Sequence, residues 1–332
     1  MSQPSAALDR PSLPLGKTPL DRTLEQLRGW VAAHLRPGAD NHRPSRAQGL
    51  QGGARAYVLW RFQQLSPHPF LVITPTAKEA EAVVEDLRFF FNERDSDPPF
   101  ARRVHYLPAW DVVAFEDLSP TAEAVAARIE GLYHLQQTNH PIIVTTPEAV
   151  LQRLPPKNEF AARMRYLVPG DQIDLDRFAA ELDDWGYRRV PLVEDRGDFA
   201  VRGGILDIFP PAHPQPLRLD LIGDQIETIR QFDPVTQRSL NDHAELLILP
   251  VREFGLHSRT SREVLRNIEA RLMELDLLRD ERTQIIEALG NGLIFPGIEF
   301  FLPYFYPSLD TLADYLPDDT LVWLDNAGGV DA

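Results

Sequence analysis

The chain has 332 residues, a length that favours two or three domains over one compact core. Its 43% hydrophobic and 25% charged residues are ordinary for a globular protein, and no apolar run approaches the roughly 18 residues that a membrane span needs. The formal net charge of −15 argues against tight non-specific nucleic-acid binding. The absence of cysteine excludes disulfides and thiolate metal ligands, and it suits a cytoplasmic location.

The first part of the chain alternates between helical and strand patterns. Residues 1–18 contain no signal-peptide apolar core, so we expect a disordered lead-in, followed by an amphipathic helix over 19–35. Further patterns predict helices at 56–65, 77–91, 121–137 and from Pro147, and strands at 70–74, 103–108 and 141–146. This alternation predicts an α/β domain with a parallel, doubly wound sheet, beginning with residues 19–154.

The pattern changes after about residue 155, where short strands are separated by Gly, Pro and Asp. Leu217, Leu219 and Leu221 alternate with polar residues, which is the period of a half-buried strand. Gly223-Asp224 then predicts a type II′ hairpin turn. We therefore expect an antiparallel β-rich domain over 155–250, inserted into the α/β domain.

The last part, residues 251–332, predicts a long helix and a return to the first sheet. The helix should begin near residue 258, with Thr260 and Glu263 forming a capping box. Near the end of the chain, "TLVWLD" reads as a buried strand, which we assign to the parallel sheet.

"GLQGGARA", residues 49–56, resembles a phosphate-binding loop, G-x-x-x-x-G-K-[ST]. Gly49 and Gly52 are present. Where the motif requires Gly, Lys and a hydroxyl, the chain has Ala54, Arg55 and Ala56, so the backbone, charge and Mg²⁺ ligand are all altered. No apolar strand precedes the stretch. By itself it is better explained as a turn than as a nucleotide site.

The acidic motif of a nucleotide-hydrolysing sheet is also incomplete. Asp325 follows the strand "LVWL", but Asn326 occupies the position of the Glu that would orient water. Taken alone, this motif is better explained as a plain turn. Taken together, the two places where a nucleotide-hydrolysing sheet would hold its catalytic residues both lack them. The nine histidines form no H-E-x-x-H pattern, so the sequence gives no support for a metal site.

Arginines and acids are interleaved in the β-rich region. Arg188, Arg189, Arg196 and Arg202 lie among Asp and Glu residues. Spacing alone favours a solvated, salt-bridged sheet face; the other interpretation is an interaction face with arginine anchors.

Four stretches carry a family resemblance: "RGDFAVRGGILDIFPP", "RLDLIGDQIETIRQFDPVTQRS", "FPGIEFF" and "ADYLPDDTLVWLD". From about residue 20 to 330 the chain resembles the excision-repair helicase UvrB and the UvrB-like N-terminal module of the transcription-repair coupling factor, Mfd. The altered loop, Asn326 and the short segment from Trp110 to Arg128, where UvrB carries a damage-probing hairpin, favour the coupling factor. The resemblance implies a RecA-like, helicase-type sheet in which "GLQGGARA" is a relic, with no cofactor bound.

The resemblance also implies a partner, because the inserted domain docks onto the ATPase UvrA in both families. UvrB contact residues match Arg189, Arg202 and Asp220, whereas a further UvrB arginine falls on Ala200. We therefore expect a non-catalytic module that recruits UvrA to RNA polymerase stalled at DNA damage. RNA polymerase and DNA would be contacted by the rest of a longer translocase, of which this would be a fragment. The alternatives are a stand-alone paralogue, an active UvrB-like helicase subunit, or an α/β scaffold for another partner.

Overall fold

The structure is a computed structural model that describes residues 50, 52–65, 68–94, 101–112, 118–137, 140–255, 261–275, 277–326 and 329. The expected lead-in at 1–18, the helix at 19–35, Thr260 and Gly49 lie outside these residues. The chain divides into two compact units, residues 1–67 and 68–332. In the first unit, the described residues form helix α2 (Ala54–Leu65).

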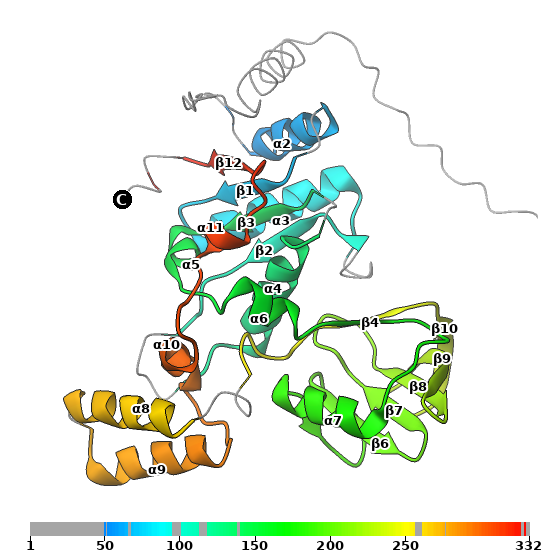
Figure 1. Ribbon diagram of the computed structural model, residues 1–332. Helices are drawn as coiled ribbons and strands as arrows, with labels where there is room; N and C mark the ends of the chain where they lie inside the picture. Colours follow the sequence, from blue (N-terminus) through cyan, green and yellow to red (C-terminus); the bar gives the residue numbers. More distant parts are fainter. Residues whose placement is uncertain are drawn as a thin grey trace, which may run out of the picture. The chain divides into compact units, whose positions relative to one another are not determined.

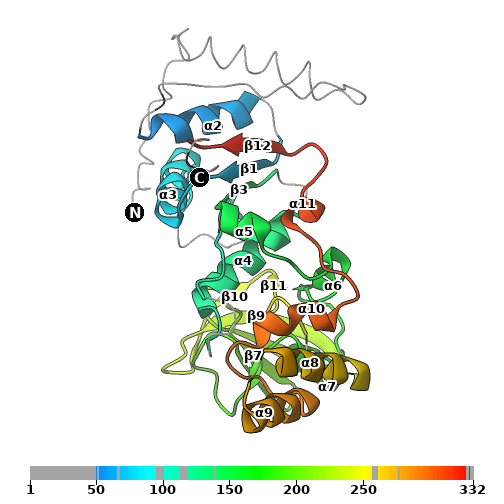
Figure 2. The ribbon, with the colours of Figure 1, turned by 90° about the vertical axis from the view of Figure 1, so that its left-hand side faces the viewer.

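The second unit contains the predicted parallel sheet, in the order β12-β1-β3-β2 (Figure 1). Its strands are β1 (Phe70–Ile73), β2 (Val104–Leu107), β3 (Ile142–Thr145) and β12 (Leu321–Leu324). Both views show β12 beside β1, although they lie at opposite ends of this unit's sequence (Figures 1 and 2). All three pairings are parallel, so the α/β fold class and the return of the last strand are confirmed. However, β12 is an edge strand with Val322 and Leu324 exposed, so the prediction that this strand is buried was wrong.

Helices cover this sheet in the α/β manner. The helices of this part are α3 (Ala77–Phe91), α4 (Ala122–His134), α5 (Pro147–Leu151), α6 (Lys157–Ala161) and α11 (Leu312–Tyr315). Ile129 and Leu132 of α4 pack with Leu71 and Leu107 of the strands in one buried cluster. All four residues of β3 are buried, as expected for a central parallel strand covered on both faces.

The β-rich region folds into a six-stranded sheet in the order β10-β9-β8-β7-β6-β5. Its strands are β5 (Arg188–Arg189), β6 (Asp198–Arg202), β7 (Ile205–Ile208), β8 (Leu217–Ile222), β9 (Gln225–Phe232) and β10 (Ser239–His243). The β8–β9 hairpin turns at Gly223-Asp224, where Gly223 has φ +61° and Asp224 a negative φ, in agreement with the predicted type II′ turn. The sheet is antiparallel except at its edge, where β5 runs parallel to β6.

A two-stranded stem leads into and out of this region. Strand β4 (Arg165–Leu167) pairs antiparallel with β11 (Leu246–Ile248), and helix α7 (Leu175–Asp184) follows β4. Figure 1 shows the stem leading from the parallel-sheet region to the six-stranded sheet. The exact domain boundaries stay a prediction.

The expected long helix is two helices, α8 (Arg262–Glu274) and α9 (Arg279–Gly290), which lie side by side (Figure 2). They are followed by the short helices η2 (Ile298–Phe301) and α10 (Leu302–Phe305). The predicted Thr260–Glu263 capping box was wrong, because Ser261 is the N-cap and accepts a hydrogen bond from the Val264 amide. The cap lies one residue further along because the Ser hydroxyl meets the same need as the Thr hydroxyl.

A buried ion pair joins the parallel-sheet region to the segment that leaves the stem. Arg128 on α4 donates from Nε to Glu253 Oε1 at 2.6 Å and from Nη2 to Oε2 at 3.1 Å. Its Nη1 donates to the Pro108 carbonyl at 2.8 Å and to Gln152 Oε1 at 2.9 Å. Trp110 Nε1 also donates to Glu253, at 2.9 Å. Each partner therefore has its charge compensated inside the protein.

Candidate protein-interaction site

One face of the six-stranded sheet, the apolar face, forms the larger core of the β-rich region, and a smaller buried cluster covers part of the other face: Val193, Ala200, Phe209 and Phe232. Leu217, Leu219 and Leu221 of β8 are buried there, with Phe178 and Leu182 of α7 against them. The predicted alternation along β8 is therefore confirmed. Because successive side chains point to opposite faces, the polar residues of β8 lie on the other side of the sheet.

We call this other side the polar face, and its members share a pattern of guanidinium groups alternating with carboxylates. They are Arg202 on β6, Asp207 on β7, Arg218 and Asp220 on β8, Thr228 and Arg230 on β9, and Asp242 on β10. Arg202, Ile205, Asp220 and Thr228 form one row across the strands, and Asp207, Arg218, Arg230 and Asp242 form the next. The structure thus places Arg202 and Asp220, two of the three predicted partner-binding residues, on one face.

Asp207 holds the centre of the polar face. Its side chain is fully buried, and it accepts from Arg218 Nε at 2.6 Å, from Arg218 Nη2 at 2.9 Å and from Arg202 Nη2 at 2.5 Å. The hydrogen bond to Asp207 raises the pKa of Arg218 despite its partial burial. Arg218 also lies over the Phe232 ring, 4.9 Å from its centroid. Asp207 therefore fixes two guanidinium groups, of which Arg202 remains the more exposed, at 47% against 16%.

Asp220 takes different partners. Thr228 Oγ1 donates to its Oδ2 at 3.0 Å, and Arg230 forms an ion pair with the same carboxylate. Asp220 lies in the same row as Arg202 with Ile205 between them, and it pairs with Arg230 and not with Arg202. Gly203 and Gly204 form a two-residue turn that places Arg202 opposite Ile205, so the nearest carboxylate within reach is the diagonal Asp207.

Arg189 lies on a different side of the sheet from the other two predicted residues. It is exposed on the edge strand β5 and level with Phe199, which belongs to the apolar-face core. Its neighbour Arg188 is level with Asp198 and donates to it from Nε at 2.8 Å. Arg188 is therefore the β5 arginine nearest to the polar face, and Arg189 is an edge residue. The partner-binding role of all three predicted residues stays a prediction.

Gly52 and Gly53 of the "GLQGGARA" stretch lead directly into helix α2. Gly52 has φ +53°, and the helix begins at Ala54, so Arg55 and Ala56 lie in its first turn. Tyr57 donates its amide to the Gly53 carbonyl at 3.0 Å, which closes that turn. A loop that enters a helix is the backbone arrangement that binds phosphate, but no Lys or hydroxyl stands at its start. The sequence prediction of a relic is compatible with this geometry and stays a prediction.

Asp325 and Asn326 end strand β12. The Asp325 amide donates to the Ile73 carbonyl at 2.9 Å, and Asn326 turns the chain with φ +52°. Asn326 is exposed and Asp325 is buried. The second motif is thus a turn at the carboxyl end of a parallel strand, where an α/β sheet commonly binds ligands.

Two further findings concern metals and membranes. Among the described residues, one group of side chains brings three possible metal-ligand atoms within 4.8 Å of one another: His105, Glu130 and His134. The sequence patterns missed it, because two members are an E-x-x-x-H pair and the third lies 25 residues before the first of them. No helix in the described part of the chain is long and apolar enough to cross a membrane.

Comparisons with known proteins support the resemblance seen in the sequence. A family model described as the UvrB interaction domain matches residues 166–254, which contain the whole polar face. The chain is 35% identical over 292 residues to the transcription-repair-coupling factor of Myxococcus xanthus, covering 86% of this chain and 24% of that protein. The proteins of the same name from Haemophilus influenzae and Escherichia coli are 30% and 25% identical, over 81% and 82% of this chain and 22% and 23% of theirs. The chain spans about a quarter of the length of these curated relatives.

Proposed function

We propose that this chain, which is related over most of its length to transcription-repair-coupling factors and carries a UvrB interaction domain, recruits UvrA to RNA polymerase stalled at DNA damage. In this proposal the module acts by binding and not by catalysis, in the bacterial cytoplasm. Contacts with RNA polymerase and DNA belong to other parts of a longer protein. The proposal rests on the resemblance for the identity of the partner and on the polar face for the place where it docks.

The main observation in favour of this docking site is the position of the Arg202 side chain. Its guanidinium is half exposed, yet it is held by the fully buried Asp207. A long side chain normally loses rotamer freedom when it is immobilised in an interface, at a cost of about 0.5–1.5 kcal/mol. Arg202 is already positioned, so less of that cost falls on binding. A planar guanidinium with free N–H groups suits a carboxylate of the partner.

The charges of the polar face favour the same kind of partner. Asp207 has no exposed surface, so the exposed charges are the guanidinium groups of Arg202 and Arg230 and the carboxylates of Asp220 and Asp242. Both carboxylates lie beside Arg230, which leaves Arg202 as the separate positive charge. An exposed Arg202 guanidinium on a chain of net charge −15 favours a partner that presents a carboxylate at this point. We expect Arg189 to contact the same partner at the edge of the sheet.

The test is the binding of purified UvrA to the chain by surface plasmon resonance. We expect Arg202→Ala to weaken binding at least about 30-fold, which corresponds to a hot spot of about 2 kcal/mol. Arg202→Glu should be weaker still, because it places a like charge against the partner's acid. Arg189→Ala should also lose affinity. The matched control is Arg177→Ala, since Arg177 is an exposed arginine on α7, the helix that packs on the apolar face.

The comparison is valid only for variants that keep the circular dichroism spectrum and the melting temperature of the parent. If Arg202→Ala and Arg189→Ala both bind UvrA as tightly as Arg177→Ala does, the interface lies elsewhere. If the parent does not bind UvrA at all, the recruitment function itself is wrong.

A further inference from the structure

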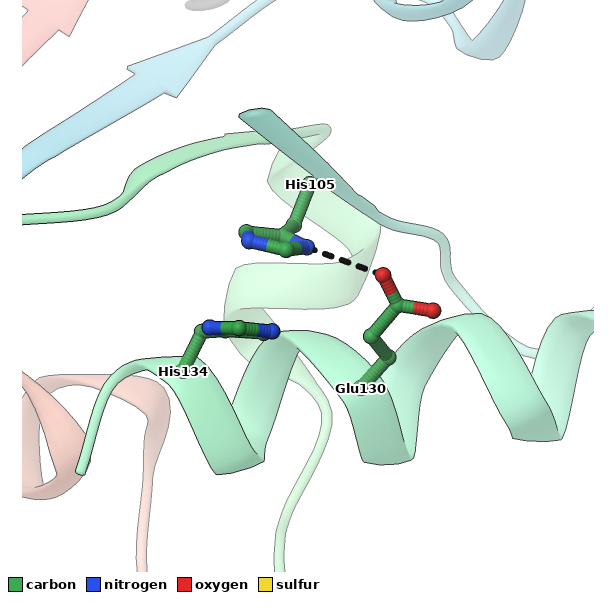
Figure 3. A group of neighbouring side chains, drawn as sticks. All are labelled: His105, Glu130 and His134. Atoms are coloured by element: carbon green, nitrogen blue, oxygen red, sulfur yellow. Dashed lines mark hydrogen bonds and ion pairs between the residues drawn. The ribbon is translucent and has the colours of Figure 1, made fainter. Parts of the chain in front are cut away.

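Two histidines and a glutamate converge between strand β2 and helix α4 (Figure 3). His105 Nδ1 lies 3.1 Å from Glu130 Oε1, and one ligand atom from each of His105, Glu130 and His134 lies within 4.8 Å of the others. The two imidazole rings are stacked, with centroids 3.7 Å apart and planes inclined by 17°. His105 and His134 are buried, whereas the Glu130 side chain keeps 15% of its surface exposed.

The local fold explains why these side chains meet. Glu130 and His134 are one helical turn apart, so they lie on the same face of α4. Gly131, between them, lets the helix approach the sheet closely, because a Cβ there would lie 3.3 Å from Leu107 Cδ1 on β2. His105 is on the same strand as Leu107 and on the same side of it. The packing of the helix on the strand therefore brings the three groups together.

The hydrogen bonds of His105 direct one of its ring nitrogens at Glu130. His105 Nε2 lies 3.1 Å from the Arg102 carbonyl oxygen, which can only accept, so Nε2 carries the hydrogen. The other nitrogen, Nδ1, faces the Glu130 carboxylate at 3.1 Å. A metal ion bound by these two atoms would also be within reach of His134.

We propose that His105, Glu130 and His134 form a binding site for a divalent transition-metal ion of the zinc class. Two imidazole nitrogens and one carboxylate are ligands that Zn²⁺ takes in tetrahedral sites, with the fourth position left to water. Ligands of such an ion lie about 3.4 Å apart, and each imidazole binds it in the plane of its ring. Because the two rings are stacked in nearly parallel planes, one imidazole must turn out of the stack for both to bind one ion. The bond from His105 Nε2 to the Arg102 carbonyl is the outer contact that orients metal-bound histidines.

Two neighbouring charges set the expected strength of the site. Arg88 and Arg102 act electrostatically on the Glu130 carboxylate, and their positive charges oppose a cation. We therefore expect micromolar affinity. Imidazole donors exclude Mg²⁺ and Ca²⁺ as good occupants, since both prefer oxygen ligands. The site is separate from the polar face, and it does not depend on UvrA recruitment.

The test is titration of the untagged, EDTA-treated chain with Zn²⁺ by calorimetry, and with Co²⁺ followed by its visible absorption. We expect one ion per chain, an absorption spectrum of Co²⁺ bound by nitrogen, and a higher melting temperature with Zn²⁺. His134→Phe keeps a ring for stacking but removes a donor, and Glu130→Gln removes the charge at the most exposed member. Each should weaken Zn²⁺ binding at least 10-fold.

The matched control is His68→Phe. His68 Nδ1 lies 3.1 Å from Asp319 Oδ2, so it reproduces a histidine–carboxylate pair that lacks a third ligand among the described residues. It should leave Zn²⁺ binding unchanged. The proposal is wrong if the parent binds Zn²⁺ with a dissociation constant of about 1 mM or weaker, which is typical of weak surface sites. In that case His105 and Glu130 form an ion pair only. It is also wrong if Glu130→Gln and a folded His134→Phe bind as tightly as the parent.

Discussion

Removal of Arg128 should destabilise the protein far more than removal of an exposed arginine. Arg128 is fully buried and makes four hydrogen bonds, two of them to the carboxylate of Glu253, which is itself only 3% exposed. Arg128→Met would leave Glu253 as a buried charge with the Trp110 indole as its side-chain donor. Breaking a buried pair in this way costs about 3–5 kcal/mol. Pro108 and Gln152 would each lose a donor as well.

The measurement is urea unfolding followed by tryptophan fluorescence, with Arg177→Met as the matched control. Arg177 pairs with Glu181 while 79% of its side chain is exposed, so its loss should leave the unfolding midpoint nearly unchanged. The double variant Arg128→Met/Glu253→Met removes both charges and should recover part of the lost stability. The reasoning is refuted if Arg128→Met unfolds at the same urea concentration as Arg177→Met, or if the double variant is the least stable.

Four further outcomes are expected. Asp207→Asn should lower the free energy of unfolding by about 2–3 kcal/mol in thermal denaturation, because two guanidinium groups lose their shared buried charge. Burial lowers the pKa of His213 to about 4, below its value in the unfolded chain; stability should therefore fall as pH drops from 6.5 to 4, by about 3 kcal/mol, and His213→Gln should flatten that part of the unfolding–pH profile. Calorimetric titration with ATP and Mg²⁺ should give no binding heat, since Arg55, Ala56 and Asn326 replace the required Lys, hydroxyl and Glu. Micromolar ATP binding that is lost on mutating Arg55 would contradict the interpretation of "GLQGGARA" as a relic. Gel shifts at physiological salt should show weak DNA binding without preference for a lesion, and a strong preference would overturn this expectation.

The sequence predicted those features that depend on the local repeat of apolar and polar residues. Alternation of helical and strand patterns predicted the parallel sheet, and the apolar–polar alternation of β8 predicted which residues face solvent. Local period also separated the β-rich region from the rest. These predictions succeeded because a strand has only two faces, so one buried face determines the other.

Contacts between distant residues could not be predicted from local period. Alternation gives the face of Arg202 but not its diagonal neighbour, although the two-residue turn at Gly203 and Gly204 fixes the register and could have indicated Asp207. Arg128 and Glu253 are 125 residues apart, and neither belongs to a motif. His105 and the E-x-x-x-H pair meet only because α4 packs on β2. The break between α8 and α9 was missed because the apolar stripe continues across it.

The stem of β4 and β11 gives the six-stranded sheet the connectivity of a cassette. Both of its ends leave through neighbouring, paired strands, so the chain on either side needs only one point of attachment. Chain closure between two adjacent ends has little entropic cost, which is why insertions of whole domains are tolerated at such places. A graft of residues 166–248 between two adjacent ends of an unrelated scaffold would carry the polar face with it, together with α7 and the apolar core that supports it. Such a transplant would present the proposed docking surface in the absence of the rest of the chain.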